Sequence, residues 1–135
     1  PQRVTTGIDG RRLAILVAVL EKRSGLDLSA QDIFLNAAGG VRLDEPAVDL
    51  GVALAVVSSF RDRPVDRGLV AIGEVGLGGE IRPVGQIDRR ISEARQLGFT
   101  RCVLAKENLK GLKPPPGLDV IGIADLVGAQ EIVFG

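Results

Sequence analysis

Residues 73–94 read GEVGLGGEIRPVGQIDRRISEA. This stretch decides the fold class, because it contains the end of one expected strand, a second expected strand and the start of an expected helix. The segments Gly68–Val75 and Glu80–Val84 predict two strands, and the glycines between them favour a hairpin turn. The amphipathic run Asp88–Leu97 predicts a helix that Gly98 ends, because glycine tolerates the left-handed backbone that often closes a helix.

The N-terminal half predicts two helices with a strand between them. Asp9–Ser24 begins with an N-cap residue, is followed by a glycine, and carries apolar residues at helical spacing: Leu13, Leu16, Val17 and Leu20. Asp32–Ala38 has the pattern of a strand. Ala47–Phe60 is almost wholly apolar after Asp49 and follows Pro46, which predicts a buried helix.

The C-terminal part completes the alternation of strands and helices. Arg101–Ala105 and Asp119–Ile123 predict strands, and Pro114–Gly117 between them predicts a rigid turn. A last short helix is expected from Asp125 onward. Helices that alternate with strands, interrupted by one hairpin, predict a single α/β (α+β) domain over residues 1–135 with a mixed sheet and packed helices.

Missing residue types exclude several catalytic classes. Without His, the chain holds no Ser-His-Asp triad, no Cys-His pair and no His-bearing zinc site. Cys102 is the only cysteine and lies in the apolar run RCVLA, so we expect a buried, unreactive thiol. No Walker A loop is present. Because no apolar run reaches about 18 residues and no signal peptide opens the chain, we expect a cytoplasmic protein without membrane contact.

Opposite charges gather in different parts of a chain whose net charge is zero. Residues 82–113 hold eight basic and three acidic residues, whereas residues 44–80 hold three basic and seven acidic ones. A basic surface can bind a phosphate backbone without reading its sequence, and an acidic surface can meet the basic surface of a neighbouring copy. A solvated surface without a partner is the alternative interpretation.

Three acids surround Pro46 at the start of the apolar helix. Asp44, Glu45 and Asp49 are carboxylates of the kind that act as general acid and base or hold a divalent metal. The alternative is that they cap the helix, because its N-terminal dipole and free N–H groups favour negative charge.

Two segments together resemble the ATP-dependent Lon proteases. LDEPAVDLGVALA (43–55) is similar to the Lon stretch in which D-G-P-S-A-G opens a buried helix. Residues 73–94 are similar to a second Lon stretch, G-E-[ILV]-T-L-x-G-x-V-x-P-[IV]-G-G-[LI]-K-E-K, and FTRCVLAKEN (99–108) resembles the strand and turn that follow. Their order and separation also fit.

The run NAAGGVRLDEPAVDL (36–50) resembles the more specific pattern N-[AV]-A-G-G-x-R-x-x-E-P-A-x-D-L of the Lon-like C-terminal domain in the RadA (Sms) family of bacterial DNA repair and recombination proteins. TTGIDGRRLAILVAVLEKRSGL (5–26) is similar to the opening of that domain, so the resemblance covers nearly the whole chain. It implies the Lon proteolytic-domain fold (the ribosomal protein S5 domain 2-like fold) and a C-terminal fragment of a longer protein, without the family's zinc finger and ATPase core.

The resemblance to Lon argues against Lon chemistry in this chain. Lon proteases use a serine nucleophile and a neutral lysine that takes its proton. The serine position is Ala47 here, and the lysine position is Asp88. Nothing in the spacing brings Ser58 or Ser59 to Lys106 or Lys110, so we expect no catalytic residue and no enzyme activity.

By resemblance, the domain is expected to support a homo-oligomeric ring, expected to be a hexamer, and to help bind DNA during homologous recombination and branch migration, with recombination proteins as further partners. ATP, Mg and Zn are expected only in the absent domains. The alternatives are an oligomerisation or peptide-binding scaffold without DNA contact, and a peptidase with an unrecognised nucleophile. The expected DNA contacts, each with a salt bridge as its alternative role, are Arg42, Arg82, Arg89, Arg90, Arg11, Arg12 and Arg23.

Overall fold

The computed structural model describes all of residues 1–135 and has the α/β class that the sequence predicts. Its strands form three separate ladders rather than one mixed sheet. The ladders are the parallel pair β1 (Arg3–Thr6) and β2 (Ile33–Asn36), the parallel sheet β3 (Leu69–Ile72), β6 (Arg101–Ala105) and β7 (Asp119–Ile123) in the order β3-β6-β7, and the antiparallel pair β4 (Glu74–Val75) and β5 (Ile81–Arg82).

Four α-helices and three short 3-10 helices connect these strands. The α-helices are α1 (Gly10–Ser24), α2 (Asp49–Arg61), α3 (Ile87–Gln96) and α4 (Leu126–Phe134), and the 3-10 helices are η1 (Ala38–Gly40), η2 (Pro46–Val48) and η3 (Lys106–Leu109). Two caps confirm local predictions: the Asp9 side chain accepts a hydrogen bond from the Arg11 N–H, and Gly25 ends α1 in the left-handed conformation. None of the helices combines the length and the apolar character needed to cross a bilayer.

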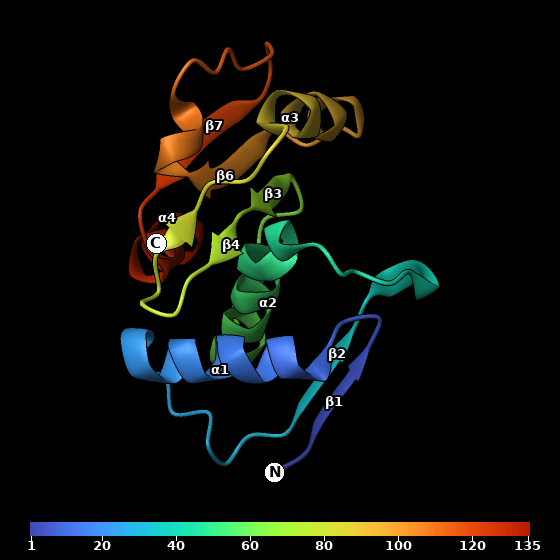
Figure 1. Ribbon diagram of the computed structural model, residues 1–135, viewed down its shortest axis with the longest axis vertical. Helices are drawn as coiled ribbons and strands as arrows, with labels where there is room; N and C mark the ends of the chain where they lie inside the picture. The colour runs from blue at the N-terminus through green and yellow to red at the C-terminus, as the bar shows by residue number, and fades with distance from the viewer.

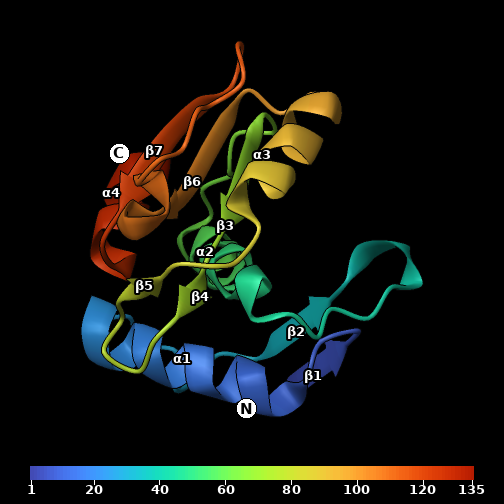
Figure 2. The same ribbon diagram turned by 45° about the horizontal axis from the view of Figure 1, so that its top comes forward.

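Helix α2 runs through the middle of the molecule, with α1 on one side of it and the β3-β6-β7 sheet on the other (Figure 1). Strand β6 separates two apolar clusters because its side chains alternate between the faces of the sheet. Cys102 and Leu104 join the cluster that includes Ile91 of α3, and Val103 and Ala105 join the larger cluster with α1, α2 and α4. Figure 2 shows α3 and α4 on different sides of the sheet.

The predicted strand Gly68–Val75 is divided at Gly73. The N–H of Gly73 donates to the carbonyl of Ala47, and its own carbonyl accepts from the N–H of Leu50, both at 3.0 Å. Gly73 is also buried, and a Cβ there would come within 2.8 Å of the Ile81 side chain. The backbone therefore leaves the β3 ladder to join the start of α2, and β4 begins a new pairing.

Two other sequence predictions differ from the structure. The sequence predicts no strand at β1, because the short segment RVTT has no apolar face. Three of its four residues are exposed in the structure. The expected helix Ala47–Phe60 begins as a 3-10 turn, and regular α-helix starts at Asp49.

Candidate functional site

The residue at the nucleophile position lies in the 3-10 turn η2 at the entrance of α2. Ala47 is buried, at 6% exposure, and its methyl group belongs to the apolar cluster that includes Ile72 and Ile91. The backbone hydrogen bond from Gly73 to its carbonyl holds this turn against the end of β3. The position is fixed in place and carries no atom that could attack a carbonyl.

The residue at the lysine position lies in the first turn of α3. Asp88 is exposed and makes no ion pair. A carboxylate there is favoured by the dipole of the helix N-terminus. A general-base lysine depends on burial to lower its pKa, and this position is open to solvent. The arrangement around Ala47 and Asp88 therefore lacks both the side chains and the burial of a Ser-Lys dyad.

A groove of about 400 Å³ lies beside Ala47. Its walls are mainly apolar side chains from β2 and α2, among them Leu35 and Val52, and Glu45 and Arg90 line it as charged residues. Glu45 and Arg90 form an ion pair that joins the loop before α2 to α3. The groove thus has an apolar surface whose charged residues neutralise each other.

Each of the three acids around Pro46 has an arginine partner. Asp44 forms an ion pair with Arg42 at 2.9 Å, Glu45 pairs with Arg90, and Asp49 pairs with Arg12. No cluster of three or more metal-ligating side chains is present. The carboxylates therefore join segments of the fold through arginines. They do not cap the helix as the alternative expected, because neither the 3-10 turn η2 nor α2 has a side-chain hydrogen bond at its N-cap.

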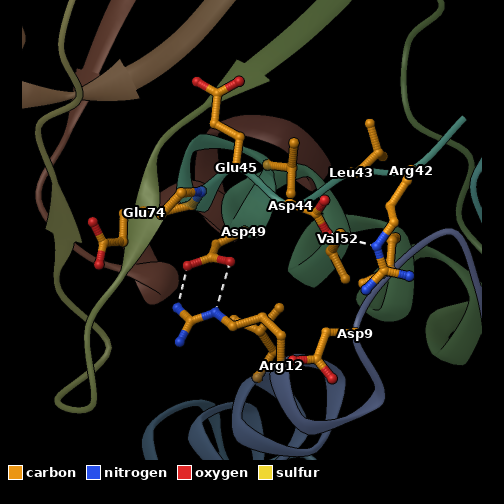
Figure 3. A pocket seen from close by; sticks show the side chains of 13 residues that line it. Asp9, Arg12, Arg42, Leu43, Asp44, Glu45, Asp49, Val52 and Glu74 are labelled. Atoms are coloured by element: carbon orange, nitrogen blue, oxygen red, sulfur yellow. Dashed lines mark hydrogen bonds and ion pairs between the residues drawn. The ribbon is translucent and has the colours of Figure 1, made fainter.

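The pair between Arg12 and Asp49 is the most buried of these contacts and lies in a pocket of about 240 Å³ between α1 and α2 (Figure 3). Asp49 is 1% exposed and accepts from the Arg12 Nε at 2.8 Å, from the Arg12 Nη2, and from the N–H of Val75 at 3.1 Å. Arg12 Nη2 also donates to the Val75 carbonyl at 2.9 Å. Hydrogen bonding to Asp49 raises the pKa of Arg12 above its ordinary value. The pair joins α1, α2 and β4.

The arginines proposed to contact DNA fall into two groups. Five of them have an acidic partner within the chain, namely Arg42, Arg82, Arg89, Arg90 and Arg12. Arg89 forms the intrahelical pair with Glu93, at 3.7 Å, and both side chains are largely exposed. Arg11 and Arg23 lie near the two ends of α1 and have no acidic partner. Because α1 and α3 lie on opposite sides of α2 (Figure 1), the seven arginines do not form one cluster.

Sequence reasoning missed the partner of Arg12, because 37 residues separate it from Asp49. It also passed over Arg95, Lys106, Lys110 and Lys113. These were counted in the basic stretch, and Lys106 and Lys110 were weighed only as partners for a serine. The signal available for Arg95 was the absence of acids at helical spacing around it.

Comparison with known proteins fits this fold. The family model described as subunit ChlI of Mg-chelatase matches residues 10–108, which is well over half of the chain. The chain belongs to this family. Among its relatives, the DNA repair protein RadA of Halalkalibacterium halodurans is 48% identical over 135 residues, and that of Bacillus subtilis is 49% identical, each across the whole chain. RadA of Streptococcus pneumoniae is 47% identical over 98% of the chain.

The RadA matches confirm the recognised resemblance to the Lon-like domain of RadA and its α/β fold. The chain spans about 30% of the length of the RadA relatives from Halalkalibacterium halodurans and Bacillus subtilis. The similarity therefore covers a segment of RadA about as long as one domain.

Proposed function

We propose that this chain serves in DNA repair as a non-proteolytic Lon-like domain that helps build a homo-oligomeric ring, with a hexamer as the expected form, and binds DNA during homologous recombination and branch migration. The name of its relatives, DNA repair protein RadA, supports the role in repair. The proposal that the domain is non-proteolytic rests on one observation. A buried Ala47 occupies the serine position and an exposed Asp88 occupies the lysine position.

The uneven distribution of charge supports head-to-tail assembly. Basic residues dominate 82–113 and acidic residues dominate 44–80. Six of the seven acids in 44–80 already pair with an arginine of the same chain, so the charges left for a neighbouring copy are mainly the basic residues of 82–113 that have no acidic partner. Heterologous contacts of this kind close into rings when the rotation between copies allows. Light scattering of the chain at several salt concentrations tests this proposal, because ring formation through charged surfaces should weaken as salt rises.

DNA binding is tested by titrating labelled duplex DNA with the chain and with an Arg89→Ala/Arg90→Ala variant over a range of salt. Loss of phosphate contacts should weaken binding and flatten the dependence of affinity on salt. Unchanged affinity and an unchanged slope would remove these two residues from the proposed DNA contacts.

The apolar groove beside Ala47 favours a second candidate, a scaffold that holds a peptide or a neighbouring copy without touching DNA. Under this alternative, light scattering still detects an oligomer, and no arginine substitution changes DNA binding by a longer protein that contains the chain. Digestion of casein or labelling by a serine-reactive probe would instead support a peptidase with an unrecognised nucleophile.

A further inference from the structure

The basic stretch 82–113 contains two kinds of basic residue. Four of its eight arginines and lysines contact a carboxylate within the chain: Arg82, Arg89, Arg90 and Arg101. The other four have no acidic partner: Arg95, Lys106, Lys110 and Lys113. The positive charge that is free to meet a ligand therefore lies in the second group.

Arg95 is the one member of this group whose side chain makes a hydrogen bond within the chain. Its Nε donates to the carbonyl of Pro116 at 2.8 Å, which joins the last turn of α3 to the Pro114–Gly117 turn. The guanidinium lies against the bare Cα of Gly117, where a Cβ would come within 2.8 Å of both Nε and Nη2. Gly117 also has φ +85°, which favours glycine. A proline-rich turn and a glycine thus form a seat for one arginine.

The Nη1 and Nη2 nitrogens of Arg95 make no hydrogen bond within the chain, and the side chain is exposed. Because a guanidinium has five N–H donors and Nε uses one, four remain in the planar fork that matches a phosphate. An arginine already held in place loses less side-chain entropy on binding. Lys113 directly precedes the Pro114–Gly117 turn and adds a second charge without an acidic partner.

The acids near this surface do not neutralise it. Glu93, in the same helix as Arg95, pairs with Arg89. Asp119 follows Gly117 by two residues, but it lies in β7 beside Arg101 of β6 and forms no ion pair with Arg95 or Lys113. Figure 2 shows the turn before β7 projecting beyond the end of the sheet. Arg95, Lys113 and Gly117 are all exposed.

We propose that the DNA phosphate backbone binds where the end of α3 meets the Pro114–Gly117 turn, with Arg95 as the fixed contact and Lys113 as a second one. This inference rests on the DNA binding proposed above and names a different surface from Arg89 and Arg90. Contact through the phosphates predicts binding that depends strongly on salt and weakly on base sequence.

The test measures fluorescence anisotropy of a labelled duplex with the 135-residue chain and an Arg95→Gln/Lys113→Gln variant at several salt concentrations. Each lost duplex contact should lower the salt slope by about 0.9 and the affinity at 0.1 M salt by up to about eightfold. Arg101→Gln is the matched control, because Arg101 has Asp66 as a partner at 4.0 Å, and it should bind like the unsubstituted chain. Competition with inorganic phosphate distinguishes a free-anion site, since millimolar phosphate would then displace the duplex at constant ionic strength.

A second variant tests the seat without changing charge. Gly117→Ala places a methyl group where the Arg95 guanidinium lies, so it should weaken DNA binding although every basic residue remains. Thermal unfolding checks that this variant is folded, and Gly111→Ala, also at positive φ but with nothing within 4 Å of its Cβ position, is the control for backbone strain.

The outcomes separate this inference from the function on which it rests. Loss of binding in Arg95→Gln/Lys113→Gln and in folded Gly117→Ala supports the proposed surface. Binding that survives both variants but is lost in Arg89→Ala/Arg90→Ala overturns the surface and leaves DNA binding in place. Absence of duplex binding by the unsubstituted chain at low salt overturns both proposals.

Discussion

Replacing Arg12 by methionine removes the cation that neutralises the buried carboxylate of Asp49. The carboxylate then keeps one hydrogen bond, from the N–H of Val75, and loses both bonds from the guanidinium. Methionine fills much of the space of the arginine stem, so the change isolates the loss of charge and hydrogen bonds better than alanine does. We expect the variant to fold with clearly lower stability.

The structure sets the size of this loss. Removing one partner of a buried ion pair costs about 3–5 kcal/mol, because the remaining charge is left without compensation. Asp49 is 1% exposed, but the Arg12 side chain is 31% exposed, so water screens part of the interaction. We therefore expect the lower end of that range, a decrease of about 3 kcal/mol in the free energy of unfolding, which corresponds to a melting temperature roughly 10 °C lower.

Urea denaturation followed by far-ultraviolet circular dichroism measures the change. The matched control is Arg89→Met, whose partner Glu93 is exposed and whose loss should cost no more than about 0.5 kcal/mol. The double variant Arg12→Met/Asp49→Leu removes both charges and should recover at least about 1 kcal/mol relative to Arg12→Met alone. Two results would refute this account of the pair. One is a decrease under about 1 kcal/mol in the free energy of unfolding of Arg12→Met. The other is a decrease in the double variant that equals the sum of the decreases in Arg12→Met and Asp49→Leu measured separately.

Other substitutions and probes test the core and the altered dyad. Burial raises the pKa of the Cys102 thiol to about 12, so at pH 8 a thiol reagent should react with it only after unfolding, and rapid labelling of the folded chain would contradict the structure. Gly7→Ala should destabilise the chain by about 2 kcal/mol or more, measured by urea denaturation, because a Cβ there would lie 2.4 Å from the Val41 carbonyl oxygen at φ +82°. Ala47→Ser/Asp88→Lys should not digest casein, since a solvent-exposed lysine keeps its proton at neutral pH; measurable digestion would show that this position becomes buried.

Features that depend on neighbours in the chain were predictable from the sequence. The Asp9 cap, the Gly25 end of α1, and strands β6 and β7 agree with prediction, because capping residues and short apolar runs act over a few positions. The division at Gly73 was not predictable, because it depends on hydrogen bonds to the start of α2. The segment Gly68–Val75 as a whole favours a strand, and nothing in it indicates that the backbone of Gly73 will bond to Ala47 and Leu50 instead of to a neighbouring strand.

The site shows the same limit in its charges. Sequence reasoning assigned Ala47 and Asp88 to the dyad positions by resemblance, because the motif around each is local. It found the basic stretch by counting, but counting does not separate an arginine with a carboxylate beside it from one without. Glu45 lies 45 residues before its partner Arg90, and only the fold brings the two together.

The paired and unpaired arginines together indicate which basic side chains of this Lon-like fold are left for a ligand. Around the old nucleophile position, the acids of the loop and helix start are each held by an arginine, two of them from distant elements, so the polar groups there join segments of the fold. An arginine held in this way has its charge balanced by a carboxylate, so a phosphate must compete with that contact. Arg95 has no such contact to break, because a backbone carbonyl positions it and leaves its terminal nitrogens free. For ligand binding, an arginine with no carboxylate partner is therefore more informative than the total of basic residues in the stretch.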